Sequence, residues 1–131
     1  MKLELKAIRA QREKWIEAVN SGDINGLSGI MSEDAVWMPA SIPALNGKKA
    51  ILDWIKPSFD NFRHQFSISQ QDFKGAGNWV VEHADFTHIL TPKDGGETAE
   101  FPGSYIVIWR WEKDNVWRIE RYVDNSNVLV E

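Results

Sequence analysis

The sequence lacks cysteine, has only two tyrosines, and contains no long hydrophobic run. Without cysteine it can form no disulfide, thiolate metal site or cysteine nucleophile, so chemistry must come from histidine, carboxylate, hydroxyl or arginine groups, or from an outside cofactor. No apolar stretch approaches the ~18 residues that span a bilayer. We therefore expect a soluble, cytoplasmic protein that does not engage a membrane.

The sequence also lacks an excess of basic residues, since its 15 Lys and Arg are outnumbered by 19 Asp and Glu, which gives a formal net charge of −4. Nucleic-acid binding draws on clustered Lys and Arg, so DNA and RNA are excluded as expected partners. The length of 131 residues suits one domain, and we predict a single domain over residues 1–131. Seven tryptophans are unusual, and they either fill a bulky core or line a cavity.

Hydrophobic spacing predicts three helices in the first half, at about 3–20, at about 23–31, and a third that carries Ile51 to Phe62. Pro57 predicts a kink or short break in the third helix. Strands are then predicted at 35–38, 66–71, 79–90, 103–111 and 116–125. The last four are joined by short connections, which favour antiparallel neighbours. The pattern indicates an α+β fold in which helices cover one face of a curved sheet.

Several short motifs follow one another in a familiar order: WIEAVNSGD at 15–23, SEDAVW at 32–37 and GKKAI at 47–51. Together with the terminal hairpin at 103–126, they resemble the nuclear-transport-factor-like superfamily, most closely its SnoaL-like and ketosteroid-isomerase-like members. The resemblance implies a cone-shaped, cystatin-like fold with a mostly antiparallel sheet, three N-terminal helices and a central pocket. It also implies a homodimer packed through the outer sheet face.

The catalytic residues of ketosteroid isomerases are not carried over. The position of the general base aligns with Pro39, one oxyanion donor aligns with Trp15, and the other falls near Ile106 or Val107. A steroid-type proton transfer at these positions is therefore not expected.

Alternation along 79–90 separates two faces, and the more apolar one carries Glu82 and His88. If this face points to the helices, Glu82 and His88 are the candidate catalytic residues, while His83 and Asp85 lie on the outer face. The alternative is that the histidines are simply surface or rim residues.

Alternation along 117–125 places Arg121 inside, where a guanidinium needs a carboxylate or an anionic ligand. Arg121 is predicted either to clamp a substrate or to form a structural ion pair with Glu82, Glu100 or Asp34. The candidate substrate-binding residues are Trp15, Trp37, Trp54, Phe59, Tyr105 and Arg121, although the aromatic ones would serve equally as core.

No metal site and no cofactor are predicted, because the histidines lack ligand spacing and no glycine-rich phosphate loop opens a helix. Two hypotheses stay open. The chain is a cofactor-independent isomerase, cyclase or dehydratase that uses acid–base chemistry on a small apolar or weakly acidic molecule. Alternatively, it is a non-catalytic ligand-binding or oligomerisation module.

Overall fold

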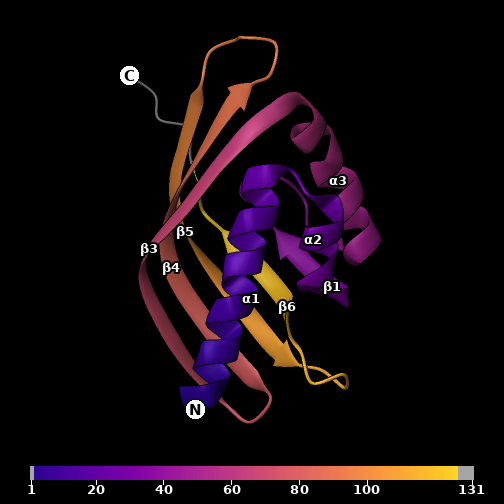
Figure 1. Ribbon diagram of the computed structural model, residues 1–131, viewed down its shortest axis with the longest axis vertical. Coiled ribbons are helices and arrows are strands. Elements are labelled where there is room, and N and C mark those ends of the chain that lie inside the picture. The colour runs from indigo at the N-terminus through magenta and orange to yellow at the C-terminus, as the bar shows by residue number, and fades with distance from the viewer. Residues whose placement is uncertain (1, 127–131) are drawn as a thin grey trace.

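The computed structural model describes the backbone of residues 2–126 and the side chains of residues 5–126 (Figure 1). The helices are α1 (Lys2–Ser21), α2 (Ile24–Gly29) and α3 (Lys48–Asn61). The strands are β1 (Met31–Met38), β2 (Leu45–Asn46), β3 (Phe62–Ala76), β4 (Trp79–Pro92), β5 (Ala99–Trp111) and β6 (Trp117–Asp124). The predicted α+β class and the helices-first order are confirmed.

All six strands form one curved sheet in the order β2-β1-β6-β5-β4-β3. The strands from β3 to β6 make the predicted antiparallel meander. Strand β1 pairs parallel with β6, and the two-residue β2 adds to the outer edge of β1. The sequence pattern predicted neither of these two pairings. The parallel pair places the first strand of the chain beside the last one.

The three helices lie on one face of the sheet, and α1 runs along its concave side (Figure 1). Gly22 ends α1 with a φ of 67°, a conformation that glycine adopts without steric cost. Asp23 then caps α2, because its carboxylate accepts a hydrogen bond of 3.0 Å from the Gly26 N–H. This tight junction lets α2 fold back so that Leu27 is buried.

Helix α3 is continuous from Lys48 to Asn61. The short break expected at Pro57 is therefore absent. Proline removes the backbone hydrogen bond to the carbonyl of Asp53, yet both residues are exposed, so water can replace that bond. No helix within residues 2–126 is both long and apolar enough to cross a membrane.

Burial along β4 alternates as predicted. Val80, Glu82, Ala84 and Phe86 are buried against the helices, whereas Trp79, Val81 and His83 are exposed. The inner face of the central strands therefore forms the floor of the core. The outer face of the sheet is not covered by any other part of residues 5–126.

The prediction that Arg121 faces the interior is wrong. On β5, the neighbours Ile108 and Trp109 pair with Arg121 and Ile119, so Glu120 is an extra residue on β6. This β-bulge shifts the alternation by one residue. Arg121 turns to the outer face, and Tyr122 takes an interior position.

Candidate functional site

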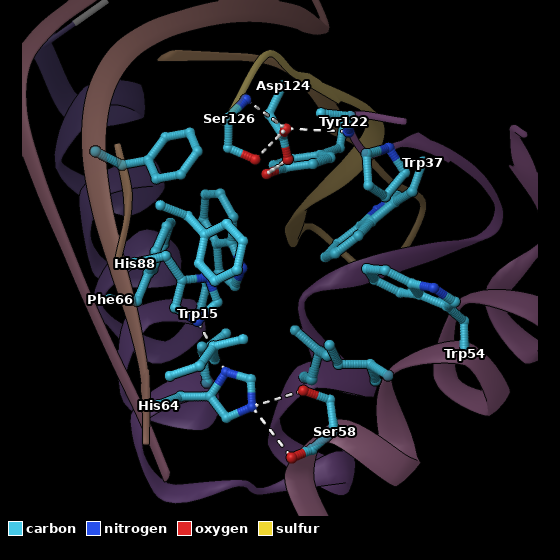
Figure 2. A pocket seen from close by; sticks show the side chains of 18 residues that line it. Trp15, Trp37, Trp54, Ser58, His64, Phe66, His88, Tyr122, Asp124 and Ser126 are labelled. Atoms are coloured by element: carbon cyan, nitrogen blue, oxygen red, sulfur yellow. Dashed lines mark hydrogen bonds between the residues drawn. The ribbon is translucent and has the colours of Figure 1, made fainter. Parts of the chain in front are cut away.

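A cavity of about 290 Å³ lies between α1, α3 and the inner face of the sheet. Aromatic and aliphatic side chains make up most of its wall (Figure 2). Three of the predicted tryptophans are there: Trp15 on α1, Trp37 on β1 and Trp54 on α3. The interior is hollow rather than filled by indole rings.

The indole rings are held by one another and by neighbouring rings. Trp15 meets Trp37 edge-on with ring centroids 6.5 Å apart, and Trp37 stacks on Tyr122 at 4.7 Å. The Trp37 indole Nε1 is buried and has no hydrogen-bond partner within residues 5–126. Trp54 is 40% exposed, which places it at the rim.

A pair of histidines lines one side of the cavity (Figure 2). His64 on β3 and His88 on β4 are joined by a bond of 2.8 Å between His64 Nδ1 and His88 Nε2. The other nitrogen of His64, Nε2, lies 3.0 Å from the Ser58 hydroxyl and 3.4 Å from the Ser58 carbonyl oxygen on α3. The three side chains form one connected polar chain in an otherwise apolar wall.

Both imidazoles are less basic than usual. Burial, and then the neighbouring His64, lowers the pKa of His88 from 6.5 to about 4, although Asp124 opposes the shift. Burial is also the main cause that lowers the pKa of His64, and the nearby Lys93 ammonium adds to it, while the Ser58 carbonyl acts in the other direction. The pair is therefore uncharged at neutral pH.

Asp124 supplies the only side-chain carboxylate in the cavity wall among the described residues, at the opposite end from Ser58 (Figure 2). Its Oδ2 accepts a bond of 2.5 Å from the Tyr122 hydroxyl. Its Oδ1 accepts from the Ala40 N–H, and from the N–H and hydroxyl of Ser126, at 3.0 to 3.1 Å. Burial, and then the negative charge of Asp124, raises the pKa of Tyr122.

Two predicted site residues lie beneath the cavity wall instead. Glu82 is fully buried, and its carboxylate accepts hydrogen bonds from the Tyr105 hydroxyl and, at 3.0 Å, from the Trp109 indole. Arg12 on α1 approaches the same carboxylate at 3.7 Å. Burial, and then the Glu82 charge, raises the pKa of Tyr105 well above its usual value. Neither Glu82 nor Tyr105 lines the cavity.

Phe59 and Arg121 are also outside the cavity wall. Phe59 packs edge-on behind His64 with ring centroids 5.0 Å apart, so it supports the histidine pair. Arg121 pairs with Glu120 at 3.2 Å, rather than with any of the three carboxylates expected. Of the eight predicted residues, the structure brings together His88, Trp15, Trp37 and Trp54.

Sequence reasoning missed five polar residues of the wall: Ser58, His64, Tyr122, Asp124 and Ser126. A signal existed for His64, because it lies two residues before Phe66 and shares its face of the strand. Alternation assigned Tyr122 and Asp124 to the outer face because it did not account for the bulge at Glu120.

Within residues 2–126, no group of three or more His, Cys, Asp or Glu side chains is arranged to hold a metal ion.

The SnoaL-like domain family matches residues 13–119, which is most of the chain. The protein therefore belongs to the SnoaL-like family, as the sequence motifs indicated. No curated protein matches its sequence.

Solved structures share the fold at low sequence identity. A conserved protein from Planctomyces limnophilus superposes with a TM-score of 0.92 at 20% identity, covering 98% of this chain and 100% of that one. A ketosteroid isomerase-like protein from Erwinia carotovora has a TM-score of 0.80 at 20% identity, with 94% and 95% covered. The hexachlorocyclohexane dehydrochlorinase LinA-type3 from Novosphingobium barchaimii has a TM-score of 0.82 at 16% identity, with 98% and 91% covered.

Proposed function

We propose that the cavity binds a small molecule and that His88 exchanges a proton with it, in a cofactor-independent isomerisation, cyclisation or dehydration. The main support for this proposal is the uncharged imidazole of His88, which lies on the wall of an apolar cavity and is hydrogen-bonded at 2.8 Å to the imidazole of His64. The ketosteroid isomerase-like and dehydrochlorinase relatives support this class of chemistry through their shared fold.

One tautomer of the histidine pair gives His88 a free lone pair for proton transfer. We assign the proton of His64 to Nε2, from which it can be donated to the Ser58 hydroxyl oxygen at 3.0 Å or to the Ser58 carbonyl oxygen at 3.4 Å. His64 Nδ1 then accepts from His88 Nε2–H, which leaves a lone pair on His88 Nδ1. In this arrangement, His88 Nδ1 takes a proton from the bound molecule and later returns it, and the negative charge of Asp124 stabilises the intermediate imidazolium.

Deuterium exchange into a panel of ring compounds tests the proposal. Cyclic ketones and hydroxylated ring compounds are incubated with the protein in D2O, and NMR follows deuterium entering their carbon positions. We expect exchange of at least one compound, a loss of about 100-fold in His88→Gln, and full activity in His83→Gln, since His83 is exposed on the outer face. Equal exchange by His88→Gln would refute the role of His88.

A non-catalytic ligand-binding protein is the second candidate function. The observation that favours it is the low pKa of His88, about 4, because general bases work best with a pKa near the operating pH. Under this alternative, ring compounds bind in the cavity and shift its tryptophan fluorescence, but none exchanges deuterium above the rate in buffer.

We also propose that two copies associate through the outer face of the sheet. Four large apolar side chains are exposed there on β4, β5 and β6: Trp79, Val81, Ile106 and Val123, each 37–45% accessible. A contiguous apolar surface of this kind typically marks a protein interface.

A further inference from the structure

The polar atoms that remain available in the cavity differ in kind from those of an anion-binding site. Within residues 5–126, the Asp124 carboxylate accepts each of the hydrogen bonds that it makes. Oδ1 has three donors, whereas Oδ2 has one, so Oδ2 retains capacity for another donor. Asp124 therefore offers the cavity a negative charge and a hydrogen-bond acceptor.

With the proton of His88 on Nε2, as assigned above, the histidine pair adds a second acceptor and no positive charge. His88 Nε2 is engaged with His64, and Nδ1 has no partner within residues 5–126. Burial keeps both rings neutral at pH 7. No Lys or Arg side chain of residues 5–126 lines the cavity. The unpartnered Trp37 indole is an uncharged donor, so it does not offset the charge of a carboxylate.

We infer that the cavity selects neutral ring compounds that donate a hydrogen bond, such as phenols and cyclic alcohols, and excludes the corresponding carboxylates. A hydroxyl donates to Asp124 Oδ2 or His88 Nδ1, whereas a carboxylate brings a second negative charge beside Asp124 in a low-dielectric cavity. Of the two ligand classes expected from the sequence, this favours molecules that are un-ionised at pH 7. The inference rests on the proposed binding of a small molecule, but not on catalysis.

Three probes of one shape separate charge from hydrogen bonding: 2-naphthol, 2-methoxynaphthalene and 2-naphthoate. Each has a bicyclic ring of about ten carbon atoms, a size suited to a cavity of about 290 Å³. Calorimetry at pH 7 on the full chain is expected to show 2-naphthol binding at least about tenfold more tightly than 2-naphthoate. The methyl ether, which cannot donate, is expected to bind several-fold more weakly than the alcohol.

Asp124→Asn identifies the carboxylate as the cause. Removing its charge is expected to raise the affinity for 2-naphthoate, so that the tenfold preference falls to about threefold or less. Glu120→Gln is the matched control, because Glu120 lies on the same strand but does not line the cavity, and it should leave the preference unchanged.

The inference is overturned if 2-naphthoate binds the unmodified protein as tightly as 2-naphthol, or if 2-naphthol shows no binding at about 1 mM. If Asp124→Asn does not fold, the affinities of the unmodified protein for 2-naphthol and 2-methoxynaphthalene decide instead. Equal affinities for the two compounds would overturn the inference that the ligand must donate a hydrogen bond. None of these results depends on turnover. Failure of the deuterium-exchange experiment therefore leaves this inference intact. Likewise, failure of the binding comparison leaves the proposed proton exchange by His88 intact.

Discussion

His64 and His88 lie diagonally across neighbouring strands, and one hydrogen bond of 2.8 Å joins their rings. Because His64 also contacts the Ser58 hydroxyl on α3, this bond links His88 to α3 through His64. The geometry of the histidine pair therefore depends on how α3 packs against the sheet. Two neutral imidazoles are stable together in this apolar setting, whereas two imidazolium ions would repel each other.

Acid should destabilise the protein through His88. Its folded pKa of about 4 lies below the unfolded value of 6.5, so the unfolded state binds more protons between these pH values. Stability is therefore complete above about pH 6.5 and falls as the pH drops towards about 4, by on the order of 2–3 kcal/mol from this group. Urea unfolding at pH 5 and pH 7 measures the difference. His88→Gln should reduce it, whereas an equal reduction in His83→Gln would point to another cause.

Glu82 should prove structural. Glu82→Gln leaves the buried Arg12 guanidinium with only the exposed Glu13 as a charged partner, and it weakens the bonds to Tyr105 and Trp109. We expect a loss of about 3 kcal/mol in the free energy of unfolding, measured by urea titration, with unchanged affinity for 2-naphthol. The matched control is Glu33→Gln, whose side chain is 89% exposed, with an effect below about 1 kcal/mol. A large fall in affinity with intact stability would instead assign Glu82 to the site.

Arg121→Ala should have little effect on the cavity. The side chain is 40% exposed and pairs with Glu120 on the outer face. Calorimetry should give an affinity for 2-naphthol within about twofold of the unmodified protein, and stability should change by less than about 1 kcal/mol. A tenfold loss of affinity would show that the guanidinium reaches the bound molecule after all.

The proposed association through the sheet can be tested by sedimentation. The unmodified chain should behave as a species of twice 15.0 kDa at micromolar concentration. Ile106 is 45% exposed, opposite His83 on β4 and Val123 on β6, so Ile106→Lys should produce the monomer by burying a charge in the interface. Thr98→Lys, in the exposed connection before β5, is the control and should remain associated. A monomeric unmodified chain would refute the interface.

The sequence predicted the parts of the fold that depend on local pattern. Period-two alternation placed Glu82 correctly on the inner face of β4, and helical spacing placed Trp15 inside. Alternation failed on β6, because the bulge at Glu120 arises from pairing with β5, a partner that a single strand does not specify. The bulge sends Arg121 outward.

The site depended on long-range contacts for the same reason. His64 is 24 residues from His88, and their meeting follows from the register of β3 against β4. Asp124 meets the Ala40 N–H across 84 residues, through the parallel pairing of β1 with β6. Residue types alone singled out His88 but not the partners that determine its chemistry.

The state of the His88 ring is the most direct test of the proposed acid–base site. NMR of protein carrying 15N-labelled histidine reports whether each ring nitrogen bears a proton at pH 7, and whether 2-naphthol shifts its resonance. We expect a neutral His88 with its proton on Nε2, a pKa of about 4, and a shift of the Nδ1 resonance when 2-naphthol binds. A protonated ring at pH 7, or an Nδ1 resonance unmoved by a saturating ligand, would contradict this expectation.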